Sequence, residues 1–258
     1  MRIAGARILI TGASSGIGEA TSRALALRGA SICIVARRQD RLRWLADEIR
    51  VTGASVAEHS LDLTQEGAAE EAVSTCVNDF GGIDILVNNA GRGAYLPLVD
   101  VTPSIAREMF EINVIAPLRL IRAVVPHMRR SGEGLIVNIG SNAARMARVN
   151  VGLYAATKAA LETMSTMARL ELAGTGIRVI LVSPGRTVSE FGEKALRADP
   201  LEPAPEGGLS PDGDPPVRAE YVADRILRAI ELEHAWSAAP MRDEARRAEP
   251  RLWDSVEP

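Results

Sequence analysis

The chain has 258 residues, of which 47% are hydrophobic and 24% are charged, and its formal net charge is −3. These values exclude a chain that is disordered over most of its length, and they predict a globular protein with room for one sizeable α/β domain. Arginines are mixed with acidic residues rather than gathered into a basic stripe, so nucleic acid is not an expected partner.

Targeting and metal-binding signals are also missing from the sequence. No apolar run approaches the about 18 residues of a membrane span, so no membrane contact is expected. The first residues run directly into a glycine-rich stretch rather than forming a signal peptide, so we expect the chain in the cytoplasm. The two cysteines, Cys33 and Cys76, are most simply core residues, and no metal-ligand spacing is present. The sequence therefore predicts no metal site.

The first element is a strand over residues 6–10, followed by a glycine-rich turn and a helix that stops at Gly29. The turn contains Gly12, Gly16 and Gly18, a spacing that differs from the common dinucleotide spacing. Glycines at such a turn let the backbone approach a phosphate, whose charge is met by free N–H groups at the start of the helix. The pattern predicts phosphate binding.

A second strand over residues 31–36 is followed by Arg37 and Arg38, with no acid before Asp40. In a dinucleotide-binding fold this strand end faces the adenine ribose, where an acid would bind the 2′-hydroxyl of NAD. Two guanidinium groups can instead bind the 2′-phosphate, so they favour NADP(H). The alternative is that both arginines are solvated residues at the start of the next helix.

Strands then alternate with helices along the chain. Further strands are predicted at residues 56–61, 83–87, 135–139 and 177–182, with helical patterns between them. A helix should begin with Thr102 as its cap and Pro103 at its first position, and Pro117 should kink the helical region after it. This alternation predicts a single-domain Rossmann-type fold, a doubly wound parallel sheet with helices on both faces.

The chain divides into four predicted segments. Residues 1–191 form the cofactor-binding and catalytic core, and residues 219–233 form a helix of the same domain. Between them, residues 192–218 are rich in proline and glycine, and are either a mobile substrate lid or disordered. Residues 234–258 are a polar tail in which no confident strand is found.

The candidate catalytic residues lie near the end of the fifth predicted strand and on the following helix. Tyr154 and Lys158 are four residues apart, so on a helix they point the same way, and a nearby ammonium should lower the pKa of the phenol. The hydroxyl of Ser141 could hydrogen-bond the same substrate oxygen. On its own this spacing arises often by chance, and a surface lysine beside a half-buried tyrosine is the plainer alternative.

Taken together, the motifs resemble the short-chain dehydrogenase/reductase family in its single-domain branch. The likeness covers residues 6–191 and fits the helix at residues 220–231. It is carried, in family order, by Thr11-Gly-x-x-x-Gly-Ile-Gly18, Asp62, Asn88-Asn-Ala-Gly91, Asn113, Ser141, Tyr154-x-x-x-Lys158 and Pro184-Gly185.

The resemblance implies an NADP(H)-dependent oxidoreductase that interconverts a ketone or aldehyde and an alcohol. Tyr154 would be the general acid and base, Ser141 would orient the carbonyl, and Asn113 would hold a water that relays protons to Lys158, which also binds the nicotinamide ribose. The implied cofactor contacts are Gly12, Ser14, Ser15, Gly16, Ile17, Gly18, Arg37, Arg38, Asp62, Leu63, Asn89, Ala90, Gly91, Lys158, Pro184, Gly185, Thr187 and Ser189.

The chain departs from the family pattern in three places. Thr187 and Ser189 stand where valine and threonine are usual, and Gly140 replaces a serine that often precedes the catalytic one. The tail lacks the apolar final strand that many relatives use at one interface. A homodimer is therefore expected, with a homotetramer as the alternative.

Two alternatives to this enzyme remain open. One is a non-catalytic NADP(H)-binding sensor or scaffold of the same fold, against which the intact Ser141, Tyr154 and Lys158 argue. The other is a sugar-nucleotide epimerase or dehydratase, which needs an added substrate domain. The substrate is a small carbonyl or alcohol compound of unknown identity, and Arg145 and Arg148 could either pair with an acidic group on it or be exposed loop residues.

Overall fold

The computed structural model of the chain describes residues 1–146, 148–197, 216–233 and 236–237. The strands are β1 (Arg7–Thr11), β2 (Ser31–Ala36), β3 (Val56–Ser60), β4 (Ile85–Asn88), β5 (Ala94–Tyr95), β6 (Gly134–Ile139), β7 (Ile177–Ser183), β8 (Thr187–Val188), β9 (Leu196–Arg197), β10 (Val217–Arg218) and β11 (Trp236–Ser237). The helices are α1 (Gly16–Leu27), α2 (Gln39–Val51), α3 (Ala68–Phe80), α4 (Pro103–Phe110), α5 (Ala116–Ser131), α6 (Gly152–Glu171), α7 (Glu190–Glu193) and α8 (Ala219–Leu232), with shorter helices at Leu98–Asp100 and Asn142–Arg145 and a π-helical turn at Glu111–Ile115.

The central sheet has seven strands in the order β11-β7-β6-β4-β1-β2-β3, and every pairing in it is parallel. The chain builds outward from β1 to β3 and then returns to build outward from β4 in the other direction. In such sheets the loops that leave the two strands at the reversal point form a crevice for ligands. Here those loops follow β1 and β4, so the predicted Rossmann-type fold is confirmed.

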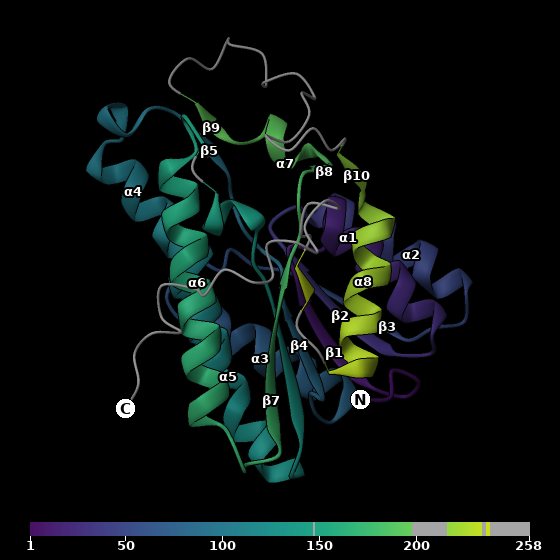
Figure 1. Cartoon of the computed structure of the whole chain (residues 1–258). Coiled ribbons are helices and arrows are strands. Elements are labelled where there is room, and N and C mark those ends of the chain that lie inside the picture. The colour runs from purple at the N-terminus through teal and green to yellow at the C-terminus, as the bar shows by residue number, and fades with distance from the viewer. Residues whose placement is uncertain (147, 198–215, 234–235, 238–258) are drawn as a thin grey trace, which may run out of the picture.

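Helices cover both faces of this sheet. Figure 1 shows α1, α2 and α8 on one side and α3, α5 and α6 on the other. Successive side chains of a strand point to opposite faces, so Ile8 and Ile10 join the core beneath the first group, whereas Leu9 joins the core beneath the second. All three are fully buried, as expected for a parallel sheet that is covered twice.

The helical region around Asn113 differs from its predicted form. Thr102 caps α4 as expected, accepting a hydrogen bond from the backbone N–H of Ile105 at 3.3 Å. Pro117, however, lies in the first turn of α5, where its missing N–H costs little. The π-helical turn Glu111–Ile115 directly precedes α5, and the kink at Pro117 stays a prediction.

The C-terminal part of the chain contains a strand that the sequence does not predict. The two residues of β11 pair with Val182 and Ser183 of β7 and form the edge of the sheet. No confident strand was found there from the sequence, because a two-residue strand depends on its partner and leaves almost no pattern in the sequence. The rest of the tail lies outside the described residues.

The predicted insert at residues 192–218 is described only at its two ends. The strand β9 pairs with β5, and β10 pairs with β8, in two small sheets above the central one. Residues 198–215, on which the choice between a lid and disorder falls, lie outside the described residues. Within the described ranges, no helix combines the length and the apolarity that crossing a membrane requires.

Candidate active site

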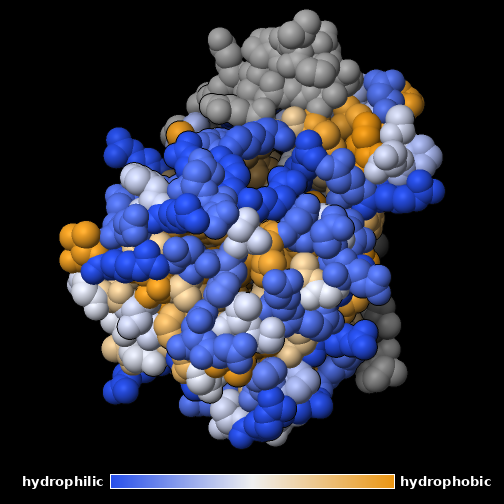
Figure 2. All heavy atoms as spheres, turned by 180° about the vertical axis from the view of Figure 1, so that it is seen from behind, coloured by the Kyte–Doolittle hydropathy of each residue, from blue (hydrophilic) through white to orange (hydrophobic). Residues whose placement is uncertain are grey.

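A cleft of about 930 Å³ opens at the carboxyl ends of the strands, over the point where the strand order reverses. This volume is in the range of small-molecule and cofactor sites. Toward the same end of the molecule, Figure 2 shows a hollow rimmed by hydrophilic residues. Of the predicted site residues, the cleft is lined by Gly12, Ser14, Ser15, Gly16, Ile17, Arg37, Arg38, Asp62, Leu63, Asn89, Ala90, Gly91, Ser141, Tyr154, Lys158, Pro184, Gly185, Thr187 and Ser189.

The glycine-rich turn packs so closely on the loop after β4 that side chains are excluded. A Cβ on Gly12 would lie 2.7 Å from the Cα of Ala90, and one on Gly18 would lie 2.4 Å from Nδ2 of Asn89. Gly12 also has a φ of +66°, which favours glycine. Asn89 holds this packing by donating hydrogen bonds to the carbonyls of Thr11 and Gly12. Gly18 thus shapes the turn from beneath rather than lining the cleft.

The start of α1 fits the phosphate group that the sequence predicts there. Ser15 occupies the cap position of the helix, but its side chain makes no capping hydrogen bond. The backbone at Ser15, Gly16 and Ile17 borders the cleft. Unpaired N–H groups at a helix start carry the positive end of the helix dipole, so this cradle suits a phosphate.

The arginine pair at the end of β2 is only partly available. Arg37 is exposed, whereas Arg38 is held by both Ser14 and Glu190. Nε of Arg38 donates to Oγ of Ser14 at 3.2 Å, its Nη2 donates to the carbonyl of Ser14 at 3.0 Å, and its Nη1 lies 2.9 Å from Oε2 of Glu190. Glu190 comes from α7, across the cleft, and it was not predicted.

Glu190 also pairs with Arg41, at 3.2 Å, and with Lys194. The hydrogen bonds from Lys194 and Arg38 lower the pKa of Glu190 to about 2, so the carboxylate is ionised at neutral pH. The sequence offered no signal for this contact, because 152 positions separate Glu190 from Arg38.

The predicted adenine site at the end of β3 is formed by Asp62 and Leu63. Oδ1 of Asp62 accepts hydrogen bonds from the N–H and the hydroxyl of Thr64, which orient the carboxylate. Leu63 is only 4% exposed and packs in the core beneath the cleft. The two residues offer a polar edge beside an apolar wall, which suits a flat heterocycle.

The candidate catalytic tyrosine lies half-buried beside Ser141 in the cleft. Burial raises the pKa of Tyr154 above its ordinary value of 10.0, a hydrogen bond with Ser141 acts in the opposite direction, and Tyr95 adds to the increase. The predicted lowering of this pKa is therefore wrong here, because the loss of hydration outweighs the hydrogen bond with Ser141. At neutral pH the phenol keeps its proton.

Lys158 lies on the same side of α6 as Tyr154, as the spacing predicts. Its Nζ is 5.9 Å from the centre of the tyrosine ring and donates to the carbonyl of Ile139 at 2.9 Å. The side chain is almost fully buried, and burial lowers the pKa of Lys158 to about 8.

Asn113 connects the π-helical turn to the loop after β4. Its Oδ1 accepts from the N–H of Arg92 at 2.9 Å, and its Nδ2 donates to the carbonyl of Arg92 and to Oγ1 of Thr157. It does not line the cleft itself, although a Cβ on Gly91 would lie between Asn113 and Lys158, 3.0 Å and 3.6 Å from them. These hydrogen bonds indicate that Asn113 positions the loop after β4. The water that Asn113 is expected to hold stays a prediction.

The loop after β7 packs against the candidate catalytic residues. The N–H of Asn142 donates to the carbonyl of Pro184 at 3.0 Å, and Ser189 caps α7 by accepting from the N–H of Phe191. The ring of Phe191 lies 5.7 Å from that of Tyr154, at 58° to it. Phe191 was not among the predicted residues, although its place shortly after Pro184 was a usable signal.

The two arginines considered for an acidic substrate have different surroundings. Arg145 donates to Glu162 on α6 and does not line the cleft. Arg148 is exposed and does line it, beside Met146 and Val151. Any contact between an acidic substrate and this loop would therefore involve Arg148.

The sequence of this chain is similar to those of known proteins. A family model described as short chain dehydrogenase matches residues 6–199. A short chain dehydrogenase of Pseudocercospora fijiensis is 37% identical over 193 residues, which cover 74% of this chain and 62% of that protein.

Two solved structures are similar over most of this chain. A short-chain dehydrogenase from Sphingobium yanoikuyae in complex with NADPH is 32% identical, with a TM-score of 0.79, and the match covers 93% of this chain and 90% of that one. A 3-ketoacyl-(acyl-carrier-protein) reductase from Brucella melitensis complexed with NADH is 26% identical, with a TM-score of 0.81, and the match covers 93% and 99%. These two proteins bind different cofactors, so the choice between cofactors rests on this chain's own residues.

Proposed function

This chain belongs to the short-chain dehydrogenase/reductase family of oxidoreductases, and on that premise we propose that it interconverts a ketone or aldehyde and an alcohol with NADP(H). The observation that carries the proposal is the common cleft. It is lined by Ser141, Tyr154 and Lys158, by the arginine pair that follows β2, and by the glycine-rich turn. A dinucleotide bound along this cleft would supply or accept the hydride.

The residues at the catalytic end suit a reduction at neutral pH. Tyr154 keeps its proton there and can donate it to the oxygen of a bound carbonyl group. Ser141, which lines the cleft together with Tyr154, can bind the same oxygen and hold it in line. Lys158 is partly protonated near its pKa of about 8, so it can bind a ribose hydroxyl and help return a proton toward Tyr154.

Cofactor preference follows from the charges near the end of β2. No acid stands directly after this strand, and Arg37 is exposed beside the cleft while Arg38 borders it. A phosphate carries up to two negative charges and matches the guanidinium fork, so these residues favour NADP(H) over NAD(H). Glu190 opposes this preference, because it already occupies one side of Arg38.

We also propose a homodimer formed through α5 and α6. Leu118 on α5 is 48% exposed, and Met167 and Leu170 on α6 are 46% and 65% exposed. Exposed large apolar side chains on neighbouring helices are typical of an interface.

The experiment that tests the function is NADPH consumption by the purified chain against a panel of ketones and aldehydes, with NADH in parallel. Tyr154→Phe keeps the ring and removes the proton donor, so turnover should fall by about 100-fold to 10,000-fold while NADPH still binds. Tyr221→Phe is the matched control, because Tyr221 lies on α8 and is 45% exposed.

Two results would contradict parts of the proposal. Tight NADPH binding without turnover of any compound in the panel would favour the non-catalytic sensor. Better activity with NADH than with NADPH would show that the arginine pair does not select the cofactor.

A further inference from the structure

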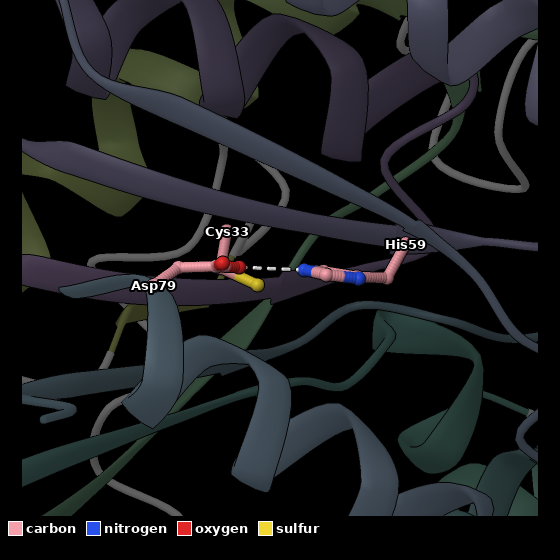
Figure 3. A group of neighbouring side chains, drawn as sticks. All are labelled: Cys33, His59 and Asp79. Carbon is pink, nitrogen blue, oxygen red and sulfur yellow. Dashed lines mark hydrogen bonds and ion pairs between the residues drawn. The ribbon is translucent and has the colours of Figure 1, made fainter. Parts of the chain in front are cut away.

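Three side chains with metal-binding atoms meet on the face of the sheet that packs against α3 (Figure 3). Cys33 lies on β2, His59 on β3 and Asp79 on α3, and their ligand atoms all lie within 4.8 Å of one another. Nε2 of His59 is 2.7 Å from Oδ2 of Asp79. None of the three lines the cofactor cleft, so the cluster is separate from the catalytic site.

The fold explains why these residues meet. In the pairing of β2 with β3, Cys33 lies opposite Ala57 and Val35 lies opposite His59. Residues two apart in a strand share a face, so Cys33 and His59 are diagonal neighbours on one side of the sheet. Asp79 comes from the last turn of α3, the helix that covers this side.

We propose that Cys33, His59 and Asp79 form a zinc-binding site. Thiolate, imidazole and carboxylate are the donors that Zn²⁺ uses in proteins, with bonds of about 2.0–2.3 Å. Tetrahedral bonds of that length separate neighbouring ligands by about 3–4 Å, so the observed cluster needs only small side-chain adjustments. Calcium and magnesium prefer all-oxygen sites, so the sulfur and nitrogen donors favour zinc.

Charge and access also suit a divalent cation. The thiolate and the carboxylate together carry two negative charges, which balance Zn²⁺. Cys33 is fully buried, whereas the side chains of His59 and Asp79 are 27% and 34% exposed, so the cluster opens to solvent on one side. A water molecule could complete the coordination there.

Binding would release a proton to the solvent. A hydrogen bond with Cys76 and burial raise the pKa of Cys33, so at neutral pH it is a thiol until a cation displaces the proton. Zinc would take the place of this proton at the cluster.

The position of the cluster indicates what zinc would do. Among the described residues, β3 is an edge strand of the central sheet and pairs only with β2. A zinc ion would tie β3 to both β2 and α3, and a ligand that binds only the folded state stabilises it. Because Asp62 follows His59 by three positions, bound zinc would also restrict the motion of the predicted adenine-binding part of the cleft.

The test uses the full chain, freed of metal by a chelator and titrated with Co²⁺ and then Zn²⁺. We expect one Co²⁺ per chain, with the thiolate charge-transfer band and the visible bands of a tetrahedral site, and displacement by Zn²⁺. Cys33→Ala should abolish the charge-transfer band. Asp79→Asn and His59→Gln should weaken Zn²⁺ binding by at least about 100-fold, more than the loss of an outer partner costs.

Matched variants separate the site from unspecific binding. Cys76→Ala changes the second core cysteine and should retain the band, and His127→Gln changes a histidine on α5 and should leave Zn²⁺ affinity unchanged. Zinc should raise the unfolding temperature of the wild type and not that of Asp79→Asn, a change at the surface that should not prevent folding. The proposal is overturned if no charge-transfer band forms, or if each control loses binding as strongly as its counterpart.

Discussion

The contact between Glu190 and Arg38 should weaken the binding of NADPH, and its removal gives a sharp test of the cofactor assignment. Nη1 of Arg38 lies 2.9 Å from Oε2 of Glu190, on a guanidinium that borders the cleft. A 2′-phosphate bound there would compete with this carboxylate for Arg38 and would be repelled by its charge. Glu190→Gln removes the charge and keeps the size of the side chain.

The expected change in NADPH affinity follows from the exposure of the ion pair between Arg38 and Glu190. Both side chains are 32% exposed, and an ion pair of this kind contributes about 0.5–1 kcal/mol. Its removal should therefore tighten NADPH binding by about twofold to fivefold, since 1.4 kcal/mol corresponds to a factor of ten. The dissociation constant of NADH should change less, because NADH has no 2′-phosphate.

Fluorescence titration of both cofactors measures this difference directly. Glu162→Gln is the matched control, since Glu162 pairs with Arg145 away from the cleft and its loss should leave both constants unchanged. The gain should shrink at high salt, because screening weakens the competing charge. Weaker NADPH binding in Glu190→Gln, or an equal change for both cofactors, would refute this reasoning.

Three further predictions concern stability and assembly. Burial lowers the pKa of Lys158 from 10.5 to about 8, a cost of about 3 kcal/mol that is present below pH 8 and is relieved as the pH rises toward 10.5. Lys158→Met should therefore raise the unfolding free energy at pH 7 while activity is lost; a less stable variant by denaturant unfolding would contradict this. Asn138 accepts from Asn88 and donates to Ser165, both at 2.8 Å and buried, so Asn138→Ala should cost about 2–3 kcal/mol in the same measurement, and a loss below 1 kcal/mol would count against it. Leu170→Glu should shift the proposed dimer toward monomer in light scattering; an unchanged mass would exclude this face as the interface.

Much of the fold follows from patterns within short stretches of sequence. The strand over Ser31–Ala36 has the predicted bounds, and the helix at Pro103 begins with its predicted Thr102 cap. Both depend on residues within a few positions of one another, so local hydrophobicity and capping are enough to place them. The parallel order of strands follows in the same way from their alternation with helices.

Some features of the candidate site depend on spacing within one element, and others depend on contacts between distant segments of the chain. The sequence by itself determined that Tyr154 and Lys158 share one side of a helix, and that the turn with Gly12 precedes α1, because both depend on spacing. Only the tertiary structure decided that burial raises the pKa of Tyr154, since burial is the sum of many distant neighbours. It also decided that Glu190 crosses the cleft to Arg38, because such contacts join segments far apart in the chain.

The cluster of Cys33, His59 and Asp79 also depends on contacts between segments that are far apart in the chain. Its members are 26 and 20 positions apart, on two strands and a helix, with no spacing that marks them as a group. The sequence determined each residue's element, and the pairing of β2 with β3 beneath α3 brought the three side chains together. Spacing reveals a site whose residues share one element, whereas a site assembled from several elements appears only when the chain is folded.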